Sequence, residues 1–243
     1  MKDKVEETYN QRCADVYDQW FGYFDKAAVD MLAELAGDGR ALELGIGTGL
    51  VALPLAARGI AVQGIDASPE MVAALRAKSG GESLPVTMGD FAEVSVEGEF
   101  SLVYIVYNTL FALQTQEEQV RCFRNVAARL APGGTFVVEV FVPDLAQLSA
   151  GQGVRLLHMT DERVGIRVYQ HDPVGQKMKS RQVVFNEGGA RVFPVEVRYA
   201  WPSELDLMAR LAGLRLRARW SDWRRSAFDA KSEKHISVYE RLA

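Results

Sequence analysis

The sequence has few of the residues and segments that tie a protein to metals, disulfides or membranes. Its 243 residues include two cysteines, Cys13 and Cys122, which are too few for a disulfide framework or a zinc cluster. No segment reaches the length of a membrane span, and the charged start over residues 1–7 lacks the apolar stretch of a signal peptide. We therefore expect a cytoplasmic protein without a metal site.

An excess of positive charge is also missing. The net charge is −4 and the pI is near 5.5, so nothing in the overall charge favours binding to nucleic acid or to an anionic membrane. The net charge does not argue against small neutral or cationic ligands. With 48% hydrophobic and 25% charged residues, the composition is that of a globular protein, and the length suits one domain, or one domain with a large insertion.

Residues 40–66 predict a strand, a glycine turn, a helix and a second strand. The apolar residues 41–44 run into Gly45-Ile46-Gly47-Thr48-Gly49, as a buried parallel strand does when it breaks into a tight turn. After the glycine turn, apolar residues recur at helical spacing. The next β-type run then ends at Asp66, about twenty residues after the first glycine. That interval is typical of an acid that binds a ribose. The stretch therefore predicts a site for an adenine nucleoside.

The spacing of this motif argues against a dinucleotide. Leu50 occupies the position where the dinucleotide fingerprint has a small residue, and Glu43 before the glycines would repel a pyrophosphate but favour a cationic ligand. The sequence Glu43-x-Gly45-x-Gly47-x-Gly49 resembles the first motif of the class I S-adenosylmethionine-dependent methyltransferases. The resemblance implies methyl transfer from S-adenosyl-L-methionine, with Glu43 near the amino end of that cofactor and the glycines beside its methionine part.

The same resemblance implies further cofactor-binding residues. Tyr17 matches a tyrosine that closes over the carboxylate end of the cofactor, and Ala67 or Met71, just after the ribose-binding Asp66, would line the adenine pocket. Asp90 and Phe91 follow a third strand, where the family has an acid for the exocyclic amine and an apolar residue beside the ring. Core packing is the alternative for Met71, and simple solvation is the alternative for Asp90.

Tyr107 and Asn108 are the candidates beside the reacting methyl group. They leave the carboxyl end of a predicted fourth strand over residues 100–106, and ligands of open α/β sheets bind outside those ends. Asn108 counts for this reason as both a catalytic and a cofactor-binding candidate. The segment lacks the Asn/Asp-Pro-Pro-Tyr/Phe signature of nucleic-acid amino methyltransferases, which argues against DNA as the substrate.

Two histidines are candidate general bases. An amine acceptor needs only to arrive deprotonated, whereas a hydroxyl acceptor would need a base within hydrogen-bond reach. His158 and His171 fall in the segment predicted to cover the acceptor, while His235 lies near the end of the chain. A packing or surface role is the alternative for each.

The segment after the fifth predicted strand departs from a minimal α/β fold. Its apolar and polar residues alternate between regular turns, which predicts an antiparallel meander over 154–159, 164–171, 177–185 and 191–201. The predicted fold class is α/β, a Rossmann-like doubly wound sheet of class I methyltransferase type with an antiparallel β insertion after the fifth strand. We divide it into N-terminal helices and a cofactor-binding core (1–144), the insertion (145–201) and a C-terminal completion of the core sheet (202–243).

The ends of the chain complete the predicted fold. A helix in two pieces is expected over residues 6–35, with a break near Gly22, and a helix capped by Ser203 precedes two final strands. Arg215, Arg217 and Arg219 alternate along the first of these strands and should share a solvated face, with contact to a substrate phosphate as the alternative.

Three functions compete. The favoured one is N- or O-methylation of a small molecule in bacterial secondary metabolism. The insertion resembles that of N-methyltransferases acting on amino-deoxysugar nucleotides, in which such a sheet also helps form a dimer. The others are a protein, RNA or DNA methyltransferase and a nucleotide-binding protein without methyl transfer. The expected partners are a small-molecule acceptor and a second copy bound through the insertion, without nucleic acid or membrane.

Overall fold

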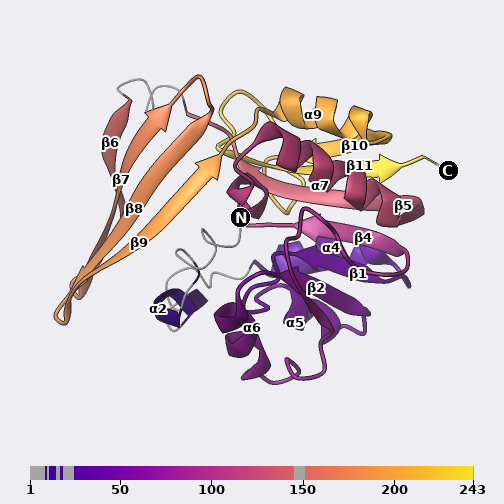
Figure 1. The fold of residues 1–243 in the computed structure, drawn as a ribbon, viewed down its shortest axis with the longest axis horizontal. Helices are drawn as coiled ribbons and strands as arrows, with labels where there is room; N and C mark the ends of the chain where they lie inside the picture. The colour runs from indigo at the N-terminus through magenta and orange to yellow at the C-terminus, as the bar shows by residue number, and fades with distance from the viewer. Residues whose placement is uncertain (1–8, 10, 15–16, 19–24, 145–150, 243) are drawn as a thin grey trace.

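The computed structural model describes residues 9, 11–14, 17–18, 25–144 and 151–242, which form a seven-stranded sheet and a separate four-stranded sheet (Figure 1). The larger sheet has the strand order β10-β11-β5-β4-β1-β2-β3. Its strands are β1 (Ala41–Leu44), β2 (Val62–Asp66), β3 (Val86–Met88), β4 (Phe100–Ile105), β5 (Leu130–Phe141), β10 (Leu214–Trp220) and β11 (Lys234–Arg241).

The larger sheet is parallel from β5 to β3 and antiparallel at its other edge. β1 pairs in parallel with both β2 and β4, and the strand order reverses between β1 and β4. β11 pairs antiparallel with both β5 and β10. The predicted α/β fold class with an antiparallel insertion is therefore confirmed, and the crevice over the ends of β1 and β4 is the place where such sheets bind ligands.

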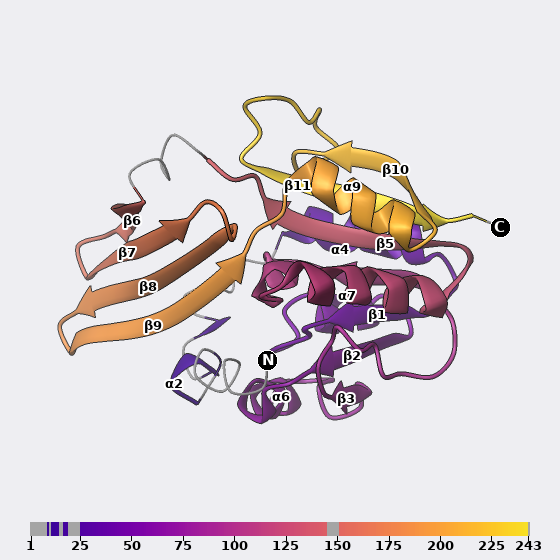
Figure 2. The ribbon, with the colours of Figure 1, turned by 45° about the horizontal axis from the view of Figure 1, so that its top comes forward.

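Helices cover both faces of the larger sheet, because its central strands are apolar on both sides. α7 and α9 pack on one face and α4 on the other (Figure 2), and α5 belongs to the same core cluster as α4. The helical elements are α2 (Gln11–Ala14), α4 (Lys26–Ala36), α5 (Ala52–Ala56), α6 (Pro69–Arg76), the 3₁₀ turn η1 (Thr109–Ala112), α7 (Gln116–Arg129) and α9 (Pro202–Leu211).

Side-chain caps fix where two of these helices begin. Ser68 accepts a hydrogen bond from the Met71 amide, and Pro69 occupies the first helical position of α6. Thr115 opens α7 with a complete capping box. The cap predicted at Ser203 is wrong, because α9 already begins at Pro202, whose fixed φ suits the first position of a helix.

The helix expected in two pieces over residues 6–35 is seen as α2 and α4, and the break predicted near Gly22 lies outside the described residues. Further along, Pro132, Gly133 and Gly134 form an irregularity within β5, where the register to β4 shifts after Phe100.

The three arginines of β10 do not share one face. A bulge shifts the register to β11 between Leu216 and Ala218, which places Arg215 opposite Glu240 and Arg219 opposite Ser237. Arg215 is exposed and pairs with Glu240, whereas Arg219 is largely buried and binds Asp206. The prediction of a common solvated face was wrong because a bulge reverses the alternation of side chains beyond it.

The smaller sheet is the insertion, and it stands to one side of the larger sheet, beside the end at which β5 leads into it (left in Figure 1). It is an antiparallel meander with the strand order β6-β7-β8-β9. Its strands are β6 (Gln152–Met159), β7 (Arg163–Asp172), β8 (Lys177–Asn186) and β9 (Gly189–Arg198). At the base of the sheet, Met178, Val195 and Val197 pack against the core.

We call the face that carries these three residues the inward face. The register of the four strands defines its other members. They are Gly153, Arg155 and His158 in β6, Arg163, Gly165, Arg167, Tyr169 and His171 in β7, Ser180, Gln182, Val184 and Asn186 in β8, and Gly189, Arg191 and Phe193 in β9. The opposite, outward face has exposed apolar side chains at Val154, Leu156 and Val192. Of the helices that the structure describes, none is long and apolar enough to cross a membrane.

Candidate active site

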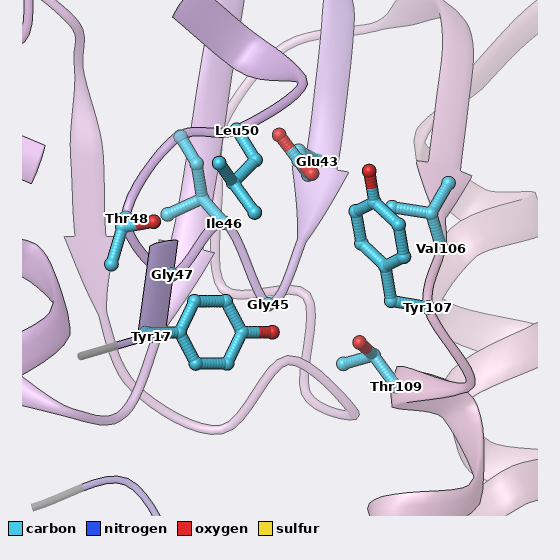
Figure 3. Close-up of a pocket in the computed structure, with 10 residues that line it drawn as sticks. All are labelled: Tyr17, Glu43, Gly45, Ile46, Gly47, Thr48, Leu50, Val106, Tyr107 and Thr109. Carbon is cyan, nitrogen blue, oxygen red and sulfur yellow. The ribbon is translucent and has the colours of Figure 1, made fainter. Parts of the chain in front are cut away.

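A pocket opens over the ends of β1 and β4, where the strand order reverses (Figure 3). It is partly open to solvent. Its lining residues are Tyr17, Glu43, Gly45, Ile46, Gly47, Thr48, Leu50, Val106, Tyr107 and Thr109. The sequence motif at residues 43–49 and the end of the fourth strand thus meet in one pocket.

The glycine turn leaves room for a ligand against its backbone. Gly45 and Gly47 have φ values of 73° and 54°, which side chains disfavour. A Cβ at Gly45 would also lie 2.5 Å from Cγ2 of Thr109, so any other residue would close the pocket at this point. Gly49, by contrast, lies against Leu53 and Leu75 and serves helix packing.

Glu43 lies at the base of the pocket with its carboxylate buried. The Tyr104 hydroxyl donates to Glu43 Oε2 at 3.0 Å. Burial raises the pKa of Glu43 to about 8, although the hydrogen bond from Tyr104 acts in the opposite direction. A cationic group at this point would favour the ionised carboxylate, so the side chain fits the amino group of the cofactor implied by the motif.

Asp66 connects the glycine turn to the start of α6. Its Oδ2 accepts from the Gly47 amide at 2.6 Å, and its Oδ1 accepts from the Ser68 amide at 2.9 Å. Burial raises the pKa of Asp66, and these amide hydrogen bonds lower it. Each carboxylate oxygen can accept more than one hydrogen bond, so both remain able to bind a ribose diol.

Tyr17 connects the pocket to the insertion. It lines the pocket and packs with Tyr9 against Cys13 and Phe193 of β9. The next residue, Asp18, accepts a hydrogen bond of 2.6 Å from the Thr48 hydroxyl. Asp18 also pairs with Lys78, which in turn donates to the Thr48 carbonyl at 2.7 Å. These contacts hold Asp18 to the glycine turn.

Tyr107 and Asn108 both have left-handed backbones, with φ values of 56° and 66°. Such conformations cost energy in residues other than glycine and concentrate at functional sites. Tyr107 lines the pocket, and burial and the nearby Glu139 raise its pKa to about 12. Asn108 is exposed and does not line the pocket, because its Oδ1 accepts a 2.7 Å hydrogen bond from the Phe141 amide.

Glu139 was missed by the sequence analysis. It is a buried acid near the end of β5 that accepts hydrogen bonds from the Tyr107 amide, from Trp223 Nε1 and from Lys234 Nζ. A single acid within the apolar run of residues 136–141 was the available signal, since buried charges need partners. The sequence around Trp223 and Lys234 did not indicate this role, because both residues lie far from Glu139 in the sequence and contact it only in the folded protein.

The remaining cofactor candidates surround the ends of β2 and β3. Met71 is buried, and its Cε lies 3.3 Å from the position of a Cβ on Gly47. Phe91 is buried beside Gly45, and Asp90 Oδ1 accepts from the Ala92 amide at 2.7 Å. Ala67 is partly exposed at the start of α6. These four residues are not among the lining residues of the pocket, and their part in binding adenine stays a prediction.

The two candidate bases lie far apart. His158 packs on Gly165 of β7, six residues from His171 on that strand, which corresponds to about 20 Å. His171 Nε2 lies 2.9 Å from the Tyr199 hydroxyl near the base of the sheet. His235 is buried on β11, where burial and Arg219 lower its pKa to about 3. Among the described residues, no group of three His, Cys, Asp or Glu side chains could hold a metal.

Known proteins that are similar to this chain in sequence or in structure are methyltransferases. A family model described as a methyltransferase domain matches residues 41–134. The cypemycin N-terminal methyltransferase of a Streptomyces species is 30% identical over 206 residues, which cover 84% of each protein. The solved structure of the CcbJ methyltransferase from Streptomyces caelestis has a TM-score of 0.90 and 40% identity, over 98% of this chain and 99% of that one.

A more distant structure shares the fold. CalS10 of Micromonospora echinaspora, an amino pentose methyltransferase solved with S-adenosylmethionine bound, has a TM-score of 0.68 and 24% identity. The likeness covers 93% of this chain and 97% of CalS10, so it includes the insertion as well as the core.

Proposed function

The chain belongs to the class I S-adenosylmethionine-dependent methyltransferases, and on that premise we propose that it methylates a nitrogen atom of a small molecule. The observation that carries this proposal is the pocket in which Glu43, the glycine turn and Tyr107 meet at the reversal of strand order. The cofactor is S-adenosyl-L-methionine.

The described residues would hold the cofactor from three sides. Glu43 and Tyr17 would bind the amino and carboxylate ends of its methionine part, and Asp66 would bind the ribose hydroxyls. At the adenine end, Asp90 would accept from the exocyclic amine between the apolar side chains of Met71 and Phe91. The geometry that supports these roles is the ring of side chains around the bare backbone of Gly45 and Gly47.

The cofactor, when bound, supplies an activated methyl group, so the protein contributes alignment and a water-poor site. Tyr107 lies across the pocket from Ile46 and Leu50 (Figure 3), and we take its side as the one from which an acceptor would approach. Glu139 holds the Tyr107 amide at 3.2 Å, and Asn108 holds β5 through Phe141. We therefore assign Glu139 and Asn108 to positioning Tyr107, which would contact the acceptor.

The surroundings of the histidines favour nitrogen over oxygen as the atom that accepts the methyl group. An amine can be methylated without a general base, whereas a hydroxyl needs one. His171 is hydrogen-bonded to Tyr199 at the base of the insertion, and the roughly 20 Å that separate it from His158 prevent a joint role. The cypemycin methyltransferase, by its name, acts on an N-terminus. O-methylation with His158 as the base is the second candidate.

The position of the insertion beside the pocket fits a small acceptor. The sheet rises beside the pocket and contacts the N-terminal segment through Phe193, which would enclose a compact acceptor. The resemblance to amino-sugar enzymes makes an amino-sugar nucleotide of bacterial secondary metabolism the specific candidate. The overall charge of −4 disfavours nucleic acid.

A homodimer through the insertion is part of the proposal. The outward face exposes 66% of Val154, 54% of Leu156 and 56% of Val192, and contiguous apolar surface of this kind is typical of interfaces. A Leu156→Glu variant should be monomeric in light scattering if this face joins two copies. An unchanged mass would refute this assembly.

Methyl transfer to matched acceptors tests the chemistry. The protein should be stabilised in a thermal shift assay by S-adenosylhomocysteine and not by NAD. With labelled cofactor, it should methylate members of a panel of small amines, such as amino sugars, and leave the corresponding hydroxyl compounds unmodified. Labelling of the hydroxyl compounds alone would overturn the assignment to nitrogen, and stabilisation by NAD alone would overturn methyl transfer.

A further inference from the structure

Tyr17 comes from a different part of the chain than the other residues that line the pocket. Those residues belong to the stretch 43–50, at the end of β1 and in the glycine turn, and to the stretch 106–109 after β4. Figure 3 shows the Tyr17 ring beside the glycine turn, with its hydroxyl pointing toward Thr109. Burial raises the pKa of this hydroxyl well above its usual value, so it keeps its proton at neutral pH. The position of this side chain must therefore be set from outside the two stretches.

One anchor holds the backbone next to Tyr17. Asp18 Oδ1 accepts a 2.6 Å hydrogen bond from the hydroxyl of Thr48, which is buried. Asp18 also pairs with Lys78, but the Asp18 side chain is 41% exposed, and exposed ion pairs are weak. This anchor fixes where the chain passes the glycine turn. It does not fix the direction of the Tyr17 ring, which depends on the side-chain torsions of Tyr17 itself.

Packing against the insertion supplies the second anchor. Tyr17 and Tyr9 pack against a cluster formed by Cys13 and Phe193, and the two tyrosine rings meet edge to face with their centroids 6.4 Å apart. Phe193 is buried and lies on β9, whereas the other three residues lie between positions 9 and 17. Within the described part of the chain, the insertion thus reaches this cluster through Phe193.

The strand that carries Phe193 is itself fixed by the core. Phe193 belongs to a row of alternate residues on the inward face of β9 that continues with Val195 and Val197. Both valines pack against the core cluster that includes residues of α7 and α9. Phe193 is also paired with Gln182 of β8 in the register of the sheet. Its backbone is therefore held by the core and by β8, so its ring can serve as a fixed support for Tyr17.

We propose that Phe193 is a positioning residue that holds the Tyr17 ring at the cofactor pocket, so that the insertion contributes to cofactor binding. The proposal rests on the proposed function, because it takes the pocket as the site of S-adenosyl-L-methionine. Phe193 is not among the residues that line the pocket, so its effect on the cofactor passes through Tyr17. A side chain that is already held in its bound position loses less conformational entropy when the ligand arrives. Removal of Phe193 should therefore weaken cofactor binding without removing a contact to the cofactor.

A double-mutant cycle with S-adenosylhomocysteine tests this role. Calorimetry gives the Kd of the full-length unmodified protein, of Phe193→Ala, of Tyr17→Ala and of the double variant. We expect Phe193→Ala to raise the Kd about fivefold or more, and Tyr17→Ala to raise it further. The Kd of the double variant should equal that of Tyr17→Ala within about twofold, because Phe193 has no ring to position once Tyr17 is truncated. A purely structural role would not make the effect of Phe193 depend on Tyr17.

Two results would overturn the proposal. One is an unchanged Kd in Phe193→Ala. The other is a pair of losses that multiply in the double variant, because Phe193 would then affect cofactor binding independently of Tyr17. Failure of S-adenosylhomocysteine to bind the unmodified protein would instead overturn the proposed function.

Phe185→Ala is the matched control. Phe185 lies on β8, the strand that pairs with β9, but its side chain points to the outward face and Phe185 is 45% exposed. The variant therefore loses the same ring from the same sheet, on the face away from Tyr17. Its Kd should equal that of the unmodified protein. An equal loss in Phe185→Ala would show that any damage to the sheet weakens binding, and the specific role of Phe193 would be wrong.

Phe193→Leu provides a second variant that is milder for the fold. It keeps most of the buried apolar surface but lacks the flat ring against which the tyrosines pack. Its Kd should lie between those of the unmodified protein and Tyr17→Ala, and the difference should again vanish when Tyr17 is truncated. Where Phe193→Ala does not fold, an unchanged Kd in Phe193→Leu would overturn the proposal.

Discussion

Tyr104 and Glu43 stand opposite each other on β4 and β1, and the Tyr104 hydroxyl donates a 3.0 Å hydrogen bond to the buried Glu43 carboxylate. Burial raises the pKa of Glu43 to about 8. The folded protein thus binds a proton that the unfolded chain releases at lower pH. Without cofactor, this group makes stability fall as pH rises from about 4.5 to about 8. Unfolding of Glu43→Gln by denaturant should lack this part of the decrease.

Cofactor binding should release a proton near neutral pH. A positively charged amino group beside Glu43 favours the ionised carboxylate, so binding lowers the pKa of Glu43. Calorimetry in two buffers with different ionisation enthalpies should show different apparent binding enthalpies. In Glu43→Gln the difference should disappear and the affinity should fall. The same buffer dependence in the variant would assign the proton to another group.

Asp66→Ala should weaken cofactor binding and also loosen the turn. Loss of the ribose contacts should raise the Kd for S-adenosylhomocysteine by about 100-fold, equivalent to about 2.7 kcal/mol. The Gly47 and Ser68 amides would lose their acceptor, which should cost about 1–3 kcal/mol of unfolding free energy. Calorimetry and denaturant unfolding measure the two effects. Unchanged affinity in the variant would refute the ribose assignment.

Asn108 should act through its oxygen rather than through its amide group. Its Oδ1 accepts from the Phe141 amide and holds the left-handed turn beside Tyr107. Asn108→Asp keeps an acceptor and should retain activity, whereas Asn108→Ala should lose about 0.5–1.5 kcal/mol of stability and some activity. Steady-state kinetics and thermal unfolding of both variants provide the measurement. Inactive but stable Asn108→Asp would show that the amide donates to a ligand.

Arg198 should be the most sensitive connection between the insertion and the core. It is buried at the end of β9 and binds Glu204 of α9 at 2.7 Å and Gln119 of α7 at 2.6 Å. Burial alone would raise the pKa of Glu204, but hydrogen bonds from Arg198 and Gln176 keep it below the usual value. Stability from Glu204 is therefore lost as pH falls through this lowered pKa.

Arg198→Met should destabilise the protein by about 3 kcal/mol, because it leaves Glu204 without its charged partner. The exposed Arg215, which pairs with Glu240, is the control, and Arg215→Met should change stability by less than about 1 kcal/mol. Urea unfolding of both variants makes the comparison. Equal losses of stability would show that the buried Arg198–Glu204 pair contributes no more than the exposed Arg215–Glu240 pair.

The sequence was sufficient to predict the sheet and the glycine turn because both depend on local pattern. Glu43, Gly45 and Asp66 occupy one strand–turn–helix–strand unit, and this spacing determines their geometry. Side-chain direction in the insertion could not be predicted, since the bulge at Leu157 alone decides that His158 faces inward. Glu139 could not be assigned a role either, because its partner Trp223 lies 84 residues further along the chain.

The choice between nitrogen and oxygen as the acceptor atom leads to opposite results for one variant. If a hydroxyl is methylated with His158 as the base, His158→Ala should lower kcat by about 10²–10⁴-fold. If an amine is methylated, the variant should keep its kcat within a few-fold. The histidine would then matter only for the fit of the acceptor, because its ring packs on Gly165 beside Arg167.

His171→Ala is the matched control, since the His171 ring is hydrogen-bonded to Tyr199 and lies about 20 Å away from His158 along the sheet. We expect both variants to remain active on amines, and a large loss of kcat confined to His158→Ala would establish O-methylation instead.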